Sequence, residues 1–420
     1  MALTLLLMIT AGLPAVIASF LFQVKPSGFQ ILWGYAIYSV LAGGLVILNR
    51  KKQLYFSTID IIALAFIGLV AIGLTFGGID RVDSSRNTFY FVLFVCMPVI
   101  VGRTFSLEGI ARFEMFLLGL LVLIPVLILL KGGIYWPEGA VRPVLFSSEY
   151  STLPLSFALG VGVLISTWRG CIAENKAAVL AHGALLVLFV AGSAYVVLRG
   201  SYYLTVLCAV GLLLVARRQK GASIMSVALT FGVMLGIGIS YGSVSYHEKL
   251  LHPALSQLSL EALYLDFFST DGGLEPGRPI LGHASCLPII ESNDSTMIRV
   301  LLYLEAVKLF LNAPLLGTGV SSFSQFSCLS TFGYPHSTVL HVAAEMGLAG
   351  LVLFISMVWK SCDVIARAAS SAKLPYWVFF VFVYYFCLDQ IYGNYFSASM
   401  TYFMVGLASK ISADEGLTRK

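Results

Sequence analysis

The stretch TFGYPHSTVLHVAAEMGLAGLVLFISMVW, residues 331–359, joins a polar segment to an apolar run that ends before Lys360. A helix of about 20 apolar residues is long enough to cross the roughly 30 Å hydrocarbon core of a bilayer. The sequence therefore predicts a membrane helix over residues 340–359. Pro335 marks a helix boundary directly before His336, so we expect a titratable imidazole at the polar rim of this helix.

The rest of the chain repeats the apolar pattern. Of its 420 residues, 58% are hydrophobic and 11% are charged, with a mean hydropathy of +0.90. An ordinary soluble domain carries about 25% charged residues, so a soluble fold is excluded. Apolar runs of membrane-spanning length recur about twelve times, which predicts an all-α polytopic membrane protein. They cover residues 3–22, 29–48, 58–76, 88–102, 113–130, 151–168, 177–198, 200–216, 222–240, 340–359, 375–392 and 394–409.

The first run, residues 3–22, lacks a basic n-region and an A-x-A cleavage site. We interpret it as a retained helix and not as a removed signal peptide.

The basic residues predict the orientation of the helices. With the N-terminus inside, 16 of the 26 Lys and Arg residues fall on the inner face and six in short outer loops. The remaining four lie in one long outer segment, to which the positive-inside rule does not apply. Both termini are therefore expected in the cytoplasm, and the net charge of +5 reflects topology and implies no nucleic-acid partner.

A single long connection, residues 241–338, is expected on the outer side, whereas every other connection is about twenty residues or shorter. Long segments of this kind are usually functional. We expect nine membrane helices in residues 1–240, amphipathic helices in the outer segment, and three membrane helices with a cytoplasmic tail in residues 339–420. One amphipathic helix of about 17 residues should begin near Ser295 and stop at Pro314.

Cys286 and Cys328 are the two of the seven cysteines that fall in the outer segment. Thiols outside the cytoplasm tend to oxidise, which predicts a Cys286–Cys328 disulfide. The alternative is a pair of buried free thiols.

Arginine dominates the charges at the outer boundary of the membrane. The short outer loops hold four arginines, against lysines at positions 25 and 131, and the long outer segment adds two arginines beside lysines at positions 249 and 308. The rigid fork of a guanidinium suits phosphate oxygens better than the point charge of an ammonium does. An anionic ligand, such as a diphosphate, is therefore expected, although any single arginine could instead anchor the chain to lipid headgroups. The arginines are Arg81, Arg86, Arg142, Arg199, Arg278 and Arg299.

His336 is the candidate catalytic base. A neutral imidazole in a partly dry cleft can accept a hydroxyl proton, which is typically worth about 10²- to 10⁴-fold in rate. The alternative is a structural histidine at a helix start whose ring nitrogens are hydrogen-bonded. His341 and Glu345 are spaced i,i+4 and so share one face of the next turn. No HExxH pattern is present, and a zinc site is not expected.

Several motifs resemble the O-antigen ligase and polymerase superfamily. PHSTVLHVAAEMGLAG is similar to its signature of a His, a small polar residue, nine residues, a Gly, two residues and a small residue. These positions fall here on His336, Ser337, Gly347 and Gly350. RVLLYLEAVKLFLNAPLLGTGVSSF, residues 299–323, resembles the stretch that precedes this signature.

Two further stretches extend the resemblance to roughly residues 140–350. LRGSYY, around Arg199, is similar to the helix start of the family at a small residue, Arg and Gly. RPVLFSSEY, from Arg142, resembles an Arg-x-x-Gly-x-Phe-x-Pro-Asn stretch but lacks its Gly and Pro-Asn.

The resemblance implies a GT-C type glycosyltransferase of the bacterial inner membrane with a periplasmic active site. Such an enzyme transfers a glycan from undecaprenyl diphosphate to a hydroxyl of lipid A–core, with inversion and without metal, cofactor or ATP. By this resemblance His336 is the base, Arg142, Arg199, Arg278 and Arg299 bind the diphosphate, and Ser337 and Glu345 orient the imidazole or the sugar. The first outer loop, QVKPSGFQ, holds no acidic residue, as expected for a metal-independent member.

Two alternatives stay open. A polymerase of the same superfamily would extend another lipid-linked glycan, but polymerases tend to have two sizeable outer loops and this chain has one. A transporter or flippase for a lipid-linked anion would use the arginines as a binding site. Transport sites lie near the midplane of the membrane, whereas these charges gather on one side.

Overall fold

The computed structural model describes ten stretches of the chain, with short gaps inside four of them. Four of these stretches are described only in part: residues 87–88 and 90–105; 114, 117–119 and 121–123; 134–135, 144–145 and 148–151; and 267, 274, 279–281 and 286. The other six are residues 56–76, 153–195, 199–241, 295–329, 334–395 and 398–418. The described residues form two compact units, each assembled from separate parts of the sequence. The first contains residues 104–250 and 362–388, and the second contains residues 53–103, 251–361 and 389–420.

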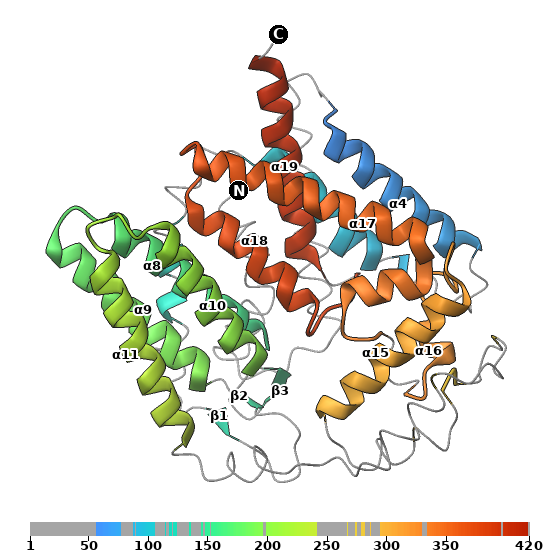
Figure 1. Cartoon of the computed structure of the whole chain (residues 1–420), viewed down its shortest axis with the longest axis horizontal. Helices are drawn as coiled ribbons and strands as arrows, with labels where there is room; N and C mark the ends of the chain where they lie inside the picture. Colours follow the sequence, from blue (N-terminus) through green and yellow to red (C-terminus); the bar gives the residue numbers. More distant parts are fainter. Residues whose placement is uncertain are drawn as a thin grey trace. The chain divides into compact units, whose positions relative to one another are not determined.

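The first unit is a group of apolar helices (Figure 1, mainly green). Helix α9 packs between α8 and α11, and α10 packs against α8. The segments of this unit pack closely against one another: a Cβ on Gly221 would overlap the backbone of α8 at Gly170. The bounds are α8 (Leu153–Ile172), α9 (Lys176–Tyr195), α10 (Arg199–Val215), α11 (Ala222–Tyr241) and α18 (Tyr376–Asp389).

Two polar contacts tie this unit together. Arg169 makes a two-pronged ion pair with buried Glu114, at 2.8 Å for each N–O pair. Ser201 Oγ is hydrogen-bonded to Ser156 Oγ and to Tyr384 Oη, each at 2.8 Å. Buried polar groups need such partners, so these contacts fix the register of the helices that carry them.

A small antiparallel sheet also belongs to the first unit. Its strands are β1 (Ile134–Tyr135), β2 (Val144–Leu145) and β3 (Ser148–Ser151), in the order β1-β2-β3. The described chain is otherwise helical, so the helical class predicted from the sequence is confirmed and the sheet is an addition to it.

The second unit carries helices from three parts of the chain. Helix α19 packs against α4 and against the π-helical turn η1 that precedes α6. A Cβ on Gly102 in α6 would overlap backbone atoms of α19, so this glycine lets α6 and α19 approach closely. The bounds are α4 (Thr58–Phe76), η1 (Val92–Cys96), α6 (Met97–Thr104), α15 (Ser295–Asn312), α16 (Phe323–Phe326), α17 (Thr338–Ser370) and α19 (Ser399–Thr418).

An ion pair and a hydrogen bond join the start of α4 and the end of α6 to the middle of α19. Arg103 lies 3.2 Å from the carboxylate of Asp60 and donates a hydrogen bond of 2.7 Å to Ser409. Ser57 also donates to Asp60, through both its backbone N–H and its hydroxyl. Asp60 is buried with all of these partners in place, as a charge at such a site requires.

The protein is an integral membrane protein. Among the described residues, three helices are long and apolar enough to cross a membrane: Thr58–Thr75, Lys176–Ala194 and Thr338–Ser370. They coincide with the predicted runs 58–76, 177–198 and 340–359. Five shorter apolar helices coincide with further runs, while residues 3–22 and 29–48 lie outside the described residues. The count of twelve and the division into three regions stay predictions.

The long segment 241–338 contains a helix where the sequence predicts one. Helix α15 runs from Ser295 to Asn312, two residues before Pro314. Its apolar face, including Leu301 and Leu309, packs with Phe323 and Cys286 into one buried cluster. This cluster gives the segment an apolar core of its own.

Candidate functional site

Helix α17 is broken at Gly347. This glycine has φ 59° and ψ −157°, which no helical residue adopts, so residues 338–346 and 348–370 are two helical pieces. A Cβ at Gly347 would lie 2.5 Å from the carbonyl carbon of Leu315 and 2.6 Å from the nitrogen of Gly317. The glycine of the His/Gly pattern is therefore needed both for its positive φ and for the close approach of another segment.

The loop that follows α15 fills the break. Gly317 and Gly319 also have positive φ, at 73° and 106°. The N–H groups of Thr318 and Gly319 donate to the carbonyls of Ala344 and Glu345, each at 3.0 Å. These carbonyls end the first helical piece and would otherwise lack partners.

The same loop caps the second piece. The N–H of Leu348 donates to the carbonyl of Pro314 at 2.7 Å, and that of Ala349 donates to Leu315 at 3.2 Å. Backbone groups freed by the break are thus paired on both sides. The Pro-Leu-Leu-Gly-x-Gly stretch is explained by this geometry, because its residues supply the turn and the caps.

Glu345 is buried in the second unit, with 1% of its surface exposed. Its Oε2 accepts hydrogen bonds from the N–H of Ser321 at 2.6 Å and from the hydroxyl of Tyr395 at 2.7 Å. Its Oε1 accepts the N–H of Phe323 at 2.9 Å. The carboxylate therefore joins α17, the segment before α16 and the segment before α19.

His341 completes this buried group. Its Nε2 lies 3.1 Å from Oε1 of Glu345, one helical turn away. The imidazole is also surrounded by aromatic rings, with centroid distances of 4.6 Å to Tyr395, 6.1 Å to Phe323 and 6.3 Å to Tyr334. The acidic and aromatic neighbours show that His341 and Glu345 belong to the interior of the unit.

His336 lies two residues before α17 and is buried, with 8% of its surface exposed. It adopts φ 55°, in the left-handed region that residues other than glycine avoid at a cost of about 1–2 kcal/mol. Its ring packs edge-on against Tyr334 at a centroid distance of 4.7 Å. The backbone of His336 thus has an unfavourable conformation directly before the helix start.

The residue after it, Ser337, caps the helix. Its Oγ accepts the N–H of Leu340 at 3.4 Å and donates to Oε1 of Gln390 at 3.2 Å. The same Gln390 oxygen accepts the N–H of Val339 at 3.0 Å. Two of the N–H groups that open α17 are paired by these side chains.

Helix α15 reaches the same region through two side chains on one face. Tyr303 donates its hydroxyl to the carbonyl of Gln390 at 3.3 Å. One turn earlier, the guanidinium of Arg299 lies 5.1 Å from the ring centroid of Tyr392, a cation–π contact. Arg299 and Tyr303 therefore contact residues 390–392, and Gln390 in turn caps the start of the helix that follows His336.

The region that contains these contacts can now be compared with known families. Residues 177–355 match the family model described as O-antigen ligase. This region is similar to the O-antigen ligase family. The match supports a glycosyltransferase-like membrane enzyme of the ligase and polymerase superfamily. A comparison with curated proteins finds no match.

The matched O-antigen ligase region ends inside the second piece of α17, and so includes the break and its loop. It also includes α9, α10, α11 and α15. Gln390 and Tyr395, which hold Ser337 and Glu345, lie beyond its end. Nothing in the sequence pattern singles out these two residues, because they are about fifty residues from their partners.

The structure brings together some of the predicted site residues. His336, Ser337, Glu345 and Arg299 all lie in the second unit. Arg199 is the first residue of α10 in the first unit, but its side chain is outside the described part. The remaining two predicted arginines, at positions 142 and 278, lie outside the described residues.

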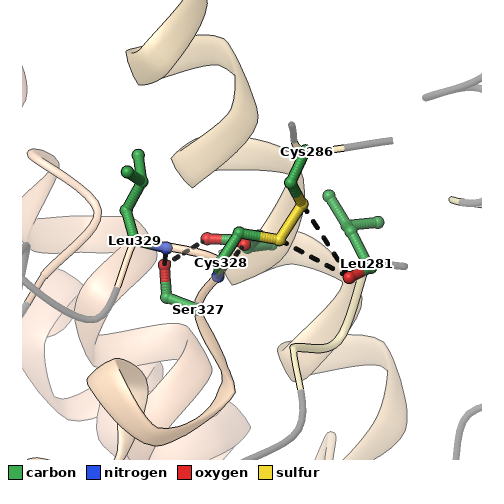
Figure 2. The surroundings of a disulfide bond; sticks show 6 residues. Leu281, Cys286, Ser327, Cys328 and Leu329 are labelled. Carbon is green, nitrogen blue, oxygen red and sulfur yellow. Dashed lines mark hydrogen bonds between the residues drawn. A yellow bond between two sulfur atoms is a disulfide. The ribbon is translucent and has the colours of Figure 1, made fainter. Parts of the chain in front are cut away.

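A disulfide joins Cys286 to Cys328, as the sequence predicts (Figure 2). Beside it, Glu305 accepts the hydroxyl of Ser327 at 2.6 Å and the N–H of Cys328 at 2.7 Å. Burial raises the pKa of Glu305 to about 7, although both hydrogen bonds oppose the shift.

These residues also form a group of metal-ligating types. Cys286, Cys328 and Glu305 are the one such group of three among the described residues, with ligand atoms within 4.8 Å of one another. Because the sulfur atoms are bonded to each other, the group offers no thiolate to a metal.

Proposed function

We propose that this protein is an O-antigen ligase of the bacterial inner membrane. It transfers a glycan from undecaprenyl diphosphate to a hydroxyl of lipid A–core at the periplasmic face, as a metal-independent GT-C type enzyme. The family match supports a glycosyltransferase-like membrane enzyme. The choice of a ligase over a polymerase rests on the single long outer segment of the sequence.

In the proposed reaction the acceptor hydroxyl oxygen attacks the anomeric carbon of the glycan. The bond from that carbon to the diphosphate breaks, and the electron pair leaves with the diphosphate, so the configuration inverts. His336 accepts the hydroxyl proton. Arg142, Arg199, Arg278 and Arg299 neutralise the charge that grows on the leaving group, which stabilises the transition state more than the ground state.

The observation that carries the proposal is the conformation of His336. A left-handed φ at a non-glycine residue persists only where the surroundings fix it, and such strain gathers at functional sites. Here the surroundings are the Ser337–Gln390 cap and the ring of Tyr334. Ser337 and Glu345 act in this proposal by holding the helix that presents the imidazole.

The test is a transfer assay with purified protein, lipid-linked glycan and lipid A–core. The His336→Ala variant is expected to lose transfer by about 10²- to 10⁴-fold while it still binds the donor. His182→Ala is the matched control, because His182 lies in α9 of the first unit and should leave transfer unchanged. Transfer by His336→Ala at the wild-type rate would remove this histidine from the mechanism.

The product distinguishes the alternatives. Glycan attached to lipid A–core with release of undecaprenyl diphosphate supports the ligase. A longer lipid-linked glycan and no extended core would show a polymerase. Movement of the donor between leaflets with no release of diphosphate would show a transporter, and the proposal would then fail.

A further inference from the structure

The second piece of α17 exposes one apolar stripe. Leu348, Val352, Ile355 and Trp359 are all exposed large hydrophobic residues, at spacings of four, three and four. This spacing puts them on one face of the second piece of the segment Thr338–Ser370, which as a whole is long and apolar enough to cross a membrane. Trp359 is followed by Lys360, an aromatic and basic pair typical of a membrane interface.

The stripe does not continue on the first piece of α17. Residues 341–347 are all buried, so this part of the helix is covered by protein. Exposed leucines reappear instead on the loop that fills the break: Leu315 is 70% exposed and Leu316 is 73% exposed. Leu311, one turn earlier at the end of α15, is exposed as well.

Backbone hydrogen bonds fix these leucines at the level of the break. The carbonyl of Leu315 accepts the N–H of Ala349, and the neighbouring Pro314 carbonyl accepts that of Leu348. Leu315 and Leu316 therefore continue the exposed stripe beyond the break, where the first piece of α17 is buried. The apolar surface passes from the helix to the loop without leaving the second unit.

The rise of the helix gives the depth of the loop. Eleven residues separate Leu348 from Trp359, a distance of about 16 Å at 1.5 Å per residue. The hydrocarbon layer is roughly 30 Å thick, so with Trp359 at one interface Leu348 lies near the middle of the layer. A loop bonded to residues 348 and 349 is at a similar depth.

We infer that residues 313–319 form a re-entrant loop inside the hydrocarbon layer, with Leu315 and Leu316 against the acyl chains of membrane lipids. Irregular backbone is tolerated at this depth only where it is buried against protein, so that its polar groups are paired, or where it lines a water-filled cavity. The part of the loop that fills the break meets that condition, because Gly317, Thr318 and Gly319 are partly buried and each donate their N–H to a carbonyl of Ala313, Ala344 or Glu345. Pro314 has no N–H to pair.

The inference concerns the surface of the protein and does not depend on glycan transfer. It places the buried Glu345 group beside a lipid-filled environment, because Gly319 is bonded to the Glu345 carbonyl. A lipid-linked substrate would then reach this side of the unit from within the leaflet.

Spin labels test the inference in the full-length protein reconstituted in lipid bilayers. The five free cysteines are replaced by alanine and the Cys286–Cys328 disulfide is kept. Single cysteines at 315 and 316 then carry a nitroxide, with Val352→Cys as the lipid-facing reference. Leu274→Cys, exposed in the outer segment, is the matched aqueous control. The free cysteines are Cys96, Cys171, Cys208, Cys362 and Cys387.

Collision rates with oxygen and with a water-soluble nickel chelate are measured at each site. The oxygen-to-nickel ratio at 315 and 316 should match that at 352 and exceed that at 274 several-fold. A ratio like that at 274 would place the loop in water and overturn the inference. Low rates with both reagents would show a protein cover, such as a second copy, and would also overturn it. Leu311→Cys tests the same edge if either loop variant fails to fold.

Discussion

Gly317 and Gly319, in the loop that fills the helix break, should differ in how much stability is lost when each is replaced by alanine. Gly317 has φ 73°, and a Cβ there would overlap backbone atoms of Glu345 and Met346. Gly319 has φ 106°, but a Cβ there would have no neighbour within 4 Å among the described residues. The same substitution by alanine therefore adds a clash at one site and backbone strain alone at the other.

The expected costs follow from these two effects. Alanine in a left-handed conformation costs about 1–2 kcal/mol, which we expect for Gly319→Ala. Overpacking adds typically about 1–3 kcal/mol, so Gly317→Ala should lose about 2–5 kcal/mol of unfolding free energy. The clash is with backbone, which cannot rotate away as a side chain can, so the higher part of this range is expected.

Equilibrium unfolding in mixed micelles, followed by the circular dichroism of the helices, measures both variants. Gly68→Ala is the reference, because Gly68 is helical and an added Cβ meets nothing within 4 Å. It should change stability by no more than about 1 kcal/mol. If Gly317→Ala is no more destabilising than Gly319→Ala, the loop does not pack into the break of α17 as described.

Three further predictions concern buried groups of the second unit. Burial raises the pKa of Glu305 from 4.5 to about 7, so the folded protein holds a proton that the unfolded chain has lost between these values. The contribution of Glu305 to stability is then complete below about pH 4.5 and falls by roughly 3 kcal/mol as the pH rises from there through 7. Glu305→Gln should remove this fall in unfolding titrations at several pH values. The Cys286–Cys328 bond closes a loop with a sequence separation of 42, so replacing both cysteines by serine should cost up to about 4 kcal/mol. Reductant should destabilise the wild type by the same amount and leave the variant unchanged. Tyr395→Phe removes a donor from the buried Glu345 carboxylate and should cost about 1.5–3 kcal/mol in the same unfolding assay, whereas a loss below about 0.5 kcal/mol would contradict the contact.

The sequence predicts those features that depend on neighbouring residues. The bounds of α15 follow from a polar start near Ser295 and from Pro314 after its end, and the structure places the helix at Ser295–Asn312. The three long membrane helices follow from apolar runs. The disulfide follows from the fact that two cysteines share the outer segment. Local composition and compartment were enough in each of these cases.

The break in α17 could not be read from the same pattern. The apolar run continues on both sides of Gly347, and glycine is frequent in membrane helices, so periodicity alone predicts one continuous helix. The break depends on a loop whose backbone replaces the missing helical hydrogen bonds. Its glycines at 317 and 319 are visible in the sequence, but their partners lie almost thirty residues away.

The surroundings of Glu345 were also beyond sequence reasoning. The prediction that Glu345 and His341 share one helix face is confirmed, because their side chains approach to 3.1 Å. The spacing gave no sign that two backbone N–H groups and Tyr395 already occupy the carboxylate. These donors come from segments that precede and follow α17 in the sequence, and only the folded chain brings them together.

The contacts at the two ends of the short helix 338–346 explain how the candidate site can be rigid in a chain whose helix is broken. At its start, Gln390 and Ser337 pair the opening N–H groups, and at its end the re-entrant loop pairs the closing carbonyls. Between them Glu345 is held by three donors, and removing any one would leave part of a buried carboxylate unpaired. A helix fixed at both ends has no low-energy way to slide or fray, so the residue just before it, His336, inherits a defined position. The broken helix thus combines two surfaces, because the piece beyond Gly347 carries the exposed apolar stripe while the first piece is held by its neighbours.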